Sequence, residues 1–136
     1  MSLSFRFGTV GSPLATPRNP GGTVGGIRCA ASLGLDALEL GWVNGVRVGA
    51  ATCALIRQAS AETGVALSVH APYYINLNGD DEKWPRLRKY LLDAAHFGNL
   101  AGATDIKGGQ RNRIEVISCK WPQSGWFEYD DDREVG

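Results

Sequence analysis

A unit of one short apolar strand, one loop and one helix recurs three times in the first 106 residues, and this repeat constrains the fold more than any other feature. The spacing of apolar residues predicts strands at residues 5–10, 37–40 and 65–69, and helices at residues 21–33, 48–63 and 82–101. A fourth strand is expected to begin at residues 103–106. Strands that alternate with helices pair in parallel through helical crossovers. The chain is therefore predicted to be an α/β protein with three to four βα units.

Helix boundaries are indicated by glycine and proline. Gly34 and Gly64 follow the first two helices and are expected to end them. Pro85 has to lie in the first turn of the third helix, because an interior proline costs about 3 kcal/mol. The glycine-rich stretch at residues 19–26 lacks the lysine and hydroxyl residue of a phosphate-binding loop, so it is interpreted as a flexible entry to the first helix. The expected apolar face of the second helix consists of Ala51, Ala54, Leu55 and Ala59.

Two architectures are compatible with this repeat, an open doubly wound sheet and a closed β/α barrel. Both use short apolar strands that are covered by helices. A closed barrel takes about 250 residues, and this chain has 136. If the fold is a barrel of the TIM type, we expect about half of one.

Composition excludes some classes of protein without selecting one. Apolar residues make up 43% and charged residues 21%, as in an ordinary globular domain. Acidic and basic residues balance at 14 each, so net charge argues neither for nor against nucleic acid. No run of about 18 apolar residues suggests a membrane span. Three cysteines without metal-binding spacing fit a reducing interior, so we expect a cytoplasmic protein.

The segment after Ile106 differs from the rest of the chain. Residues 107–136 show no helical period, and only residues 114–118 resemble a strand. We therefore expect the repeated units to occupy residues 1–106, followed by a divergent tail that packs loosely.

The sequence VHAPYYINL contains the first candidate site residues. His70 lies where the third strand meets its loop, at the edge of the sheet where β/α folds build their sites. Its imidazole can bind a metal ion, although a histidine at a strand end can also simply be hydrogen-bonded. Tyr73 and Tyr74 follow; either one is exposed and able to stack on a base or sugar, or both pack against the rim of the sheet.

The loop after the second strand, GWVNGVRVG, is expected to lie at the same edge. Asn44 and Gly45 form a turn signal, and Arg47 is placed where it can contact phosphate or remain an ordinary solvated side chain. Glu39, near the end of the strand, either faces the site as a carboxylate or pairs with a neighbouring base.

Three segments resemble a known family. RFGTVGSPLATP, GLDALELGWVNGVRVG and LSVHAPYYINL are similar, in order and spacing, to the opening of endonuclease IV, and HAPYYINL is the most specific of them. The resemblance runs from about residue 5 to residue 106. It implies a xylose-isomerase-like TIM barrel and a zinc-dependent DNA-repair enzyme that hydrolyses the DNA backbone at abasic sites.

By position in these motifs, the resemblance implies roles for four residues. His70 matches a zinc ligand, Tyr73 matches a tyrosine near the abasic site, and Asn44 and Arg47 fall in a loop that reaches DNA. The implied cofactor is zinc and the implied partner is DNA that contains abasic sites.

The resemblance ends at the fourth strand, where the family has a second histidine followed by Pro-Gly. Here KGGQRNR follows Ile106, and no histidine occurs after His96. One ligand cannot hold a hydrolytic zinc cluster, so we expect an N-terminal, truncated or frame-shifted copy that is inactive as it stands. Two alternatives remain: a metal-dependent sugar isomerase or epimerase on the same barrel, and a fragment without catalytic activity. Half a barrel also leaves an open edge, through which we expect self-association or poor solubility unless residues 114–118 cover that edge as an extra strand.

Overall fold

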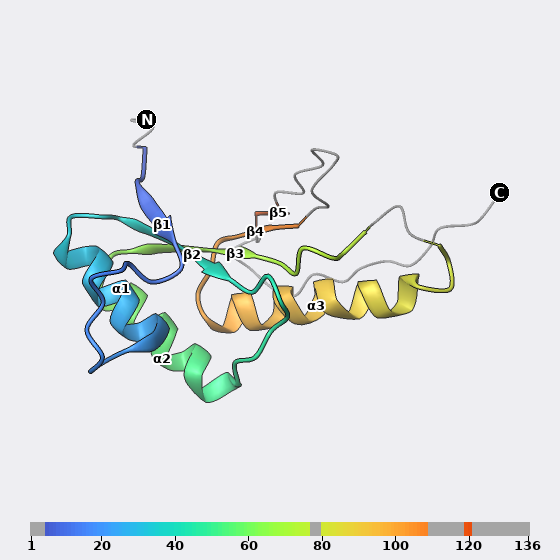
Figure 1. The fold of residues 1–136 in the computed structure, drawn as a ribbon, viewed down its shortest axis with the longest axis horizontal. Coiled ribbons are helices and arrows are strands. Elements are labelled where there is room, and N and C mark those ends of the chain that lie inside the picture. Colours follow the sequence, from blue (N-terminus) through green and yellow to red (C-terminus); the bar gives the residue numbers. More distant parts are fainter. Residues whose placement is uncertain (1–4, 77–79, 109–118, 121–136) are drawn as a thin grey trace.

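The computed structural model describes residues 5–76, 80–108 and 119–120, and in these ranges strands alternate with helices (Figure 1). The strands are β1 (Gly8–Val10), β2 (Ala37–Gly41), β3 (Ala66–His70), β4 (Asp105–Lys107) and β5 (Cys119–Lys120). The helices are α1 (Gly22–Ser32), α2 (Ala50–Thr63) and α3 (Trp84–Leu100). The predicted elements within residues 1–106 are all present, with somewhat different boundaries.

The sheet has the order β1-β2-β3-β4-β5, and its first four strands are parallel. Each parallel strand lies beside its predecessor, and Figure 1 shows all three helices on the same face of the sheet. In a doubly wound sheet the order in which strands are added reverses, and helices cover both faces. In a barrel each new strand is added on the same side of its predecessor. The arrangement is therefore that of a partial β/α barrel, which confirms the predicted fold class.

The edge beyond β4 is occupied by β5, which pairs with it in the antiparallel direction. The strand predicted at residues 114–118 lies outside the described residues. The described pairing at Cys119–Lys120 nevertheless shows that a short segment from beyond residue 108 lies along β4.

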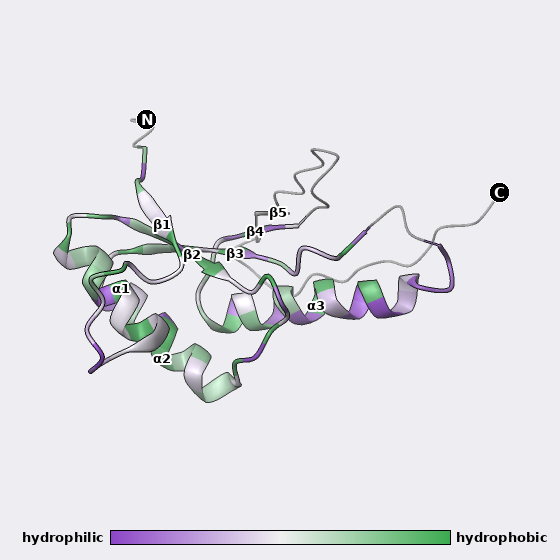
Figure 2. Ribbon diagram, viewed as in Figure 1, coloured by the Kyte–Doolittle hydropathy of each residue, from purple (hydrophilic) through white to green (hydrophobic). Residues whose placement is uncertain are grey.

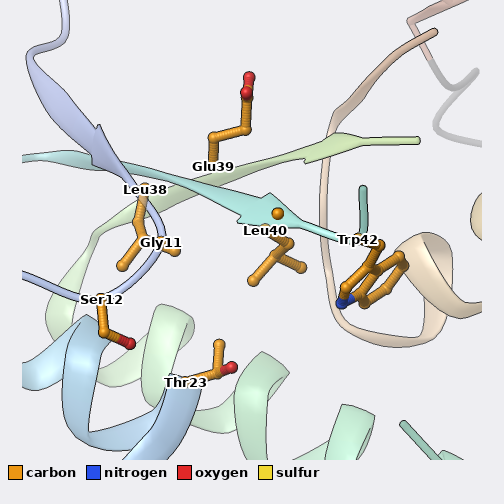
Figure 3. A pocket seen from close by; sticks show the side chains of 8 residues that line it. Gly11, Ser12, Thr23, Leu38, Glu39, Leu40 and Trp42 are labelled. Atoms are coloured by element: carbon orange, nitrogen blue, oxygen red, sulfur yellow. The ribbon is translucent and has the colours of Figure 1, made fainter. Parts of the chain in front are cut away.

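The two faces of the sheet differ in burial. Leu38, Leu40, Leu67, Val69 and Ile106 are buried against the helices. The intervening residues point to the other side, as Figure 3 shows for the Glu39 side chain, which projects away from Leu38 and Leu40. We call this second side the open face. The register assigns to it Gly8, Val10, Ala37, Glu39, Gly41, Ala66, Ser68, His70, Asp105 and Lys107.

The predicted apolar face of α2 is wrong except at its last position. Ala59 is buried, but Ala51, Ala54 and Leu55 are exposed. The residues that α2 buries are Cys53, Ile56 and Ala59. Alanine contributes little apolar surface, so the one isoleucine of the helix and its neighbour at i−3 determine which face packs on the sheet.

The glycine-rich stretch has a packing role that its interpretation as a flexible entry does not include. Helix α1 begins at Gly22, so Gly25 and Gly26 lie inside it and are buried. A Cβ atom on Gly25 would come within 1.9 Å of the Pro20 carbonyl oxygen. On Gly26 it would come within 2.2 Å of Ser12 Oγ. These glycines let the loop after β1 pack directly on the helix.

Other local predictions are confirmed. Gly34 and Gly64 follow α1 and α2 with positive φ angles of 76° and 75°, and the Gly64 amide donates to the Ser60 carbonyl at 2.9 Å. Pro85 lies in the first turn of α3.

Among residues 5–76 and 80–108, none of the helices has the length and apolar character needed to cross a membrane.

Substitution of Gly25 by alanine is expected to destabilise the fold. The added methyl group meets backbone rather than a movable side chain, and such overpacking costs about 1–3 kcal/mol. The matched control is Gly41→Ala, whose Cβ would have only Val10 Cγ1 nearby, at 4.0 Å. Urea denaturation followed by circular dichroism should show a lower midpoint for Gly25→Ala alone. Equal midpoints for the two variants would contradict the packing argument.

The open face and the side of β1 that pairs with no described strand are expected to cause self-association. Val10 is 69% exposed on this face, and uncovered strand edges and apolar patches favour pairing with other chains. Light scattering should show mass increasing with concentration, and Val10→Lys should reduce this effect by placing like charges at the contact. Leu55→Lys, on the outer surface of α2, is the control and should not. A monodisperse monomer at all concentrations would refute this prediction.

Candidate functional site

The carboxyl ends of the parallel strands bring the candidate residues to one edge of the molecule. His70 is the last residue of β3, and Asn44 and Arg47 lie in the loop that follows β2. Tyr73 lies in the loop that follows β3. The four residues therefore share the edge at which β/α proteins bind their ligands, as their order in the chain predicted.

His70 lies on the open face and not under the helices. Its register partners are Gly41 on β2 and Lys107 on β4, and the residues on either side of it, Val69 and Ala71, are buried. The ring atom Nδ1 lies 2.9 Å from the Ala71 carbonyl oxygen. Because a carbonyl only accepts, Nδ1 carries the proton in this hydrogen bond. The expected inward orientation is thus present, together with a backbone hydrogen bond.

Backbone hydrogen bonds join the two loops beyond the strand ends. The Trp42 amide donates to the His70 carbonyl at 3.0 Å, and the Tyr73 amide donates to the Val43 carbonyl at 3.2 Å. The Gly45 amide donates to the Trp42 carbonyl at 3.0 Å and closes the turn that Asn44 and Gly45 predicted. These bonds hold the loops side by side, so residues from both can contact one ligand.

The two tyrosines of the HAPYYINL segment have different surroundings. Tyr73 is 57% exposed, whereas Tyr74 is 37% exposed and packs edge-on against Tyr90 of α3, with ring centroids 5.2 Å apart. Tyr73 also meets Tyr74 edge-on at 5.6 Å. Tyr73 is therefore the more accessible ring for stacking, and Tyr74 connects it to α3.

One residue near this edge was not among the sequence candidates. Arg86, in the first turns of α3, donates from Nε to the Tyr90 hydroxyl at 2.9 Å, and its guanidinium carbon lies 5.6 Å from the centre of that ring. The hydrogen bond with Tyr90 raises the pKa of Arg86. Figure 2 shows hydrophilic positions along this half of α3. The i, i+4 spacing of Arg86 and Tyr90 is the sequence signal that could have identified their contact.

Of the two alternatives predicted for Glu39, the structure shows pairing with a base, Lys107. Glu39 Oε2 lies 3.7 Å from Lys107 Nζ and accepts a hydrogen bond from Ser68 Oγ at 3.3 Å. The carboxylate side chain is only 13% exposed, while Lys107 is 58% exposed. Glu39 therefore faces the open side but is already engaged by a base.

The described residues do not fit a zinc centre. Zinc in proteins takes three or four ligands from histidine, cysteine and carboxylate side chains. In residues 5–76 and 80–108, no group of three or more such side chains is placed to hold a metal ion. His70 has the correct chemistry, but its register neighbour on β4 is a lysine.

A hollow of about 160 Å³ lies beside this edge, near the ends of β1 and β2 (Figure 3). It is too small for a nucleotide, and the Glu39 side chain points away from it. Nothing in its lining suggests a reacting group. It is lined by Gly11, Ser12, Thr23, Leu38, Glu39, Leu40, Gly41 and Trp42.

Comparison with known proteins gives structural similarity without a sequence match. No family model matches the chain, and none of the curated proteins matches it by sequence. Among solved structures, the chain is similar to the crystal structure of endonuclease IV from Thermus thermophilus, with a TM-score of 0.61 and 23% identity. The similarity covers 76% of this chain and 39% of that one, and it shows a shared fold.

Proposed function

We propose that the edge formed by the loops after β2 and β3, which carry Asn44, Arg47 and Tyr73, binds DNA at abasic sites. We call it the loop edge. We propose further that the chain, as it stands, does not hydrolyse the DNA backbone. The proposal combines the motif resemblance to endonuclease IV with the structural similarity to an endonuclease IV. Because the chain spans well under half of that neighbour, its activity and substrate do not follow from the fold. The side chains at the loop edge have to support them.

The observation that carries the proposal is the hydrogen bond between the Tyr73 amide and the Val43 carbonyl. It joins the loop of Tyr73 to the loop of Asn44 and Arg47, and all three side chains are exposed. An arginine can pair with a phosphate, an exposed tyrosine can stack on a base or sugar, and an asparagine can hydrogen-bond to either. A single strand of nucleic acid offers all three partners.

The sugar isomerase or epimerase alternative receives no support from this arrangement. A metal-dependent isomerase on this barrel would use a strand-end carboxylate such as Glu39 to hold its metal ion. Glu39 is instead paired with Lys107 and Ser68. Binding without catalysis is therefore the function that the described residues favour.

DNA binding is tested by fluorescence anisotropy with a labelled duplex that carries one tetrahydrofuran abasic analogue and with its intact counterpart. Arg47→Gln should weaken binding to both duplexes and lower the slope of log affinity against log salt by about 0.9, the value for one lost phosphate contact. Tyr73→Ala should cost roughly 1–3 kcal/mol of stacking, mainly on the abasic duplex.

The matched control for this experiment is Arg28→Gln. Arg28 is an exposed arginine of α1 that pairs with Glu62 at 2.7 Å, and Glu62 lies near the end of α2, away from the loop edge. If Arg28→Gln and Arg47→Gln weaken binding equally, the interaction is non-specific and the proposed edge is wrong.

Cleavage is expected to be absent. The full chain, incubated with abasic duplex and excess zinc, should nick DNA no faster than zinc in buffer alone, because the described residues lack a metal-ligand set. Nicking is measured on a denaturing gel. Zinc-dependent nicking that disappears in His70→Ala would show that the chain is an active nuclease and would overturn this part of the proposal.

A further inference from the structure

Three positions lie abreast at the end of the open face, and they have very different chemistry. The register pairs Gly41 with His70 and His70 with Lys107, and the Ala71 amide donates to the Lys107 carbonyl at 2.7 Å. Adjacent strands are about 4.8 Å apart, so the His70 and Lys107 side chains leave the sheet as neighbours. Lys107 is the cation that lies next to the imidazole.

The Lys107 side chain crosses β3 to reach its partner. Glu39 lies on β2 and Lys107 on β4, with β3 between them, yet Nζ and Oε2 are 3.7 Å apart. The lysine must therefore extend over the part of the open face that Ser68 and His70 occupy. Ser68 donates to the same Glu39 oxygen, so the carboxylate is held from two sides.

His70 itself is arranged as a ligand would be. Its Nδ1 donates a hydrogen bond to a backbone carbonyl, which is one of the partners that orient metal-bound histidines. Gly41 leaves open space on the β2 side, where an added Cβ would have only Val10 Cγ1 nearby, at 4.0 Å. Steric exclusion at His70 therefore does not explain the poor fit to zinc; the adjacent ammonium and the engaged carboxylate do.

We infer that the Lys107 ammonium takes the place that a divalent metal ion would occupy between His70 and Glu39. A protonated lysine has no lone pair to offer, repels a divalent cation, and satisfies the Glu39 carboxylate that such an ion would need. The Glu39 carboxylate is thus neutralised by the chain's own cation. The structure of the open face, and any DNA binding by the loop edge, are independent of zinc. This inference does not rest on the proposed DNA binding.

Lys107 is accordingly the residue that decides whether the open face binds metal. In Lys107→His the ammonium is removed, Glu39 loses its ion pair but keeps the hydrogen bond from Ser68, and a second imidazole stands beside that of His70. Three potential ligands then project from three neighbouring strands, which matches the number found in open zinc sites. Lys107→Gln removes the ammonium without adding a ligand and separates the two effects.

The experiment is titration of the full chain with Zn²⁺ by calorimetry and with Co²⁺ by visible absorption, in the absence of DNA. The wild type should show no metal binding that depends on His70. Lys107→His should bind more tightly than the wild type by more than the roughly 10- to 100-fold that outer partners of metal ligands contribute. It should also give the intense d–d absorption of four-coordinate Co²⁺. The double variant His70→Ala, Lys107→His should lose both signals.

Two results would overturn the inference. One is zinc binding by the wild type that His70→Ala removes, because the ammonium then does not exclude the metal. The other is a folded Lys107→His variant, judged by circular dichroism, that binds zinc no better than the wild type. If that variant does not fold, Lys107→Gln decides: a gain in zinc affinity that His70→Ala abolishes supports the inference, and an unchanged affinity refutes it.

Discussion

One-sided burial of the sheet is the constraint on which the other features depend. Leu38, Leu67 and Ile106 lie on neighbouring strands and pack under the helices. Side chains alternate along a strand, so a slip by one residue would expose these three and bury charged residues such as Glu39 and Asp105. The cost of burying unpaired charge excludes that alternative. The same alternation therefore assigns Glu39 and His70 to the open face.

The ladder of backbone hydrogen bonds continues past the strand ends and gives the loops their order. The bonds from Trp42 to His70 and from Tyr73 to Val43 extend the contact between β2 and β3 into the loops that follow them. The Tyr74 ring reinforces this link by packing against Tyr90 and lies near Gly45, where its hydroxyl would be 3.5 Å from an added Cβ. An exposed residue such as Tyr73 is thereby placed without being buried, which reduces the ordering cost of binding.

The fold was largely predictable from the sequence because it follows from local patterns. Apolar runs, helix-ending glycines and the order of the elements specify parallel βα units, and the shared edge of His70 and Arg47 follows from that topology. The packed face of α2 was not predictable from its alanines, because the helix buries Cys53, Ile56 and Ala59 and leaves its other alanines exposed. The structural roles of Gly25 and Gly26 depend on how closely a distant loop approaches.

The pairing of Glu39 with Lys107 was beyond sequence reasoning for a different reason. The two residues are on strands that are not adjacent, so their contact requires the register of both pairings and the reach of a lysine side chain. The position of Arg86 and Tyr90 near the site was also not predicted, because it becomes clear only when α3 is placed beside Tyr74. Contacts between elements, such as the pairing of Glu39 with Lys107 and the packing of Tyr74 on Tyr90, depend on several elements at once, and no periodic signal in the sequence records them.

The loop edge and the open face have different structural requirements, so a change on one does not have to alter the other. The DNA binding that we propose needs exposed side chains on a fixed backbone, which the joined loops supply whatever lies on the strands behind them. A metal centre needs several ligands to converge from different strands, and a single cation such as Lys107 is enough to prevent this. The loop edge can therefore keep its order whether or not the open face fits a metal. A structural similarity at 23% identity does not distinguish an open face that fits a metal ion from one that does not. The side chains of Glu39, His70 and Lys107 make that distinction.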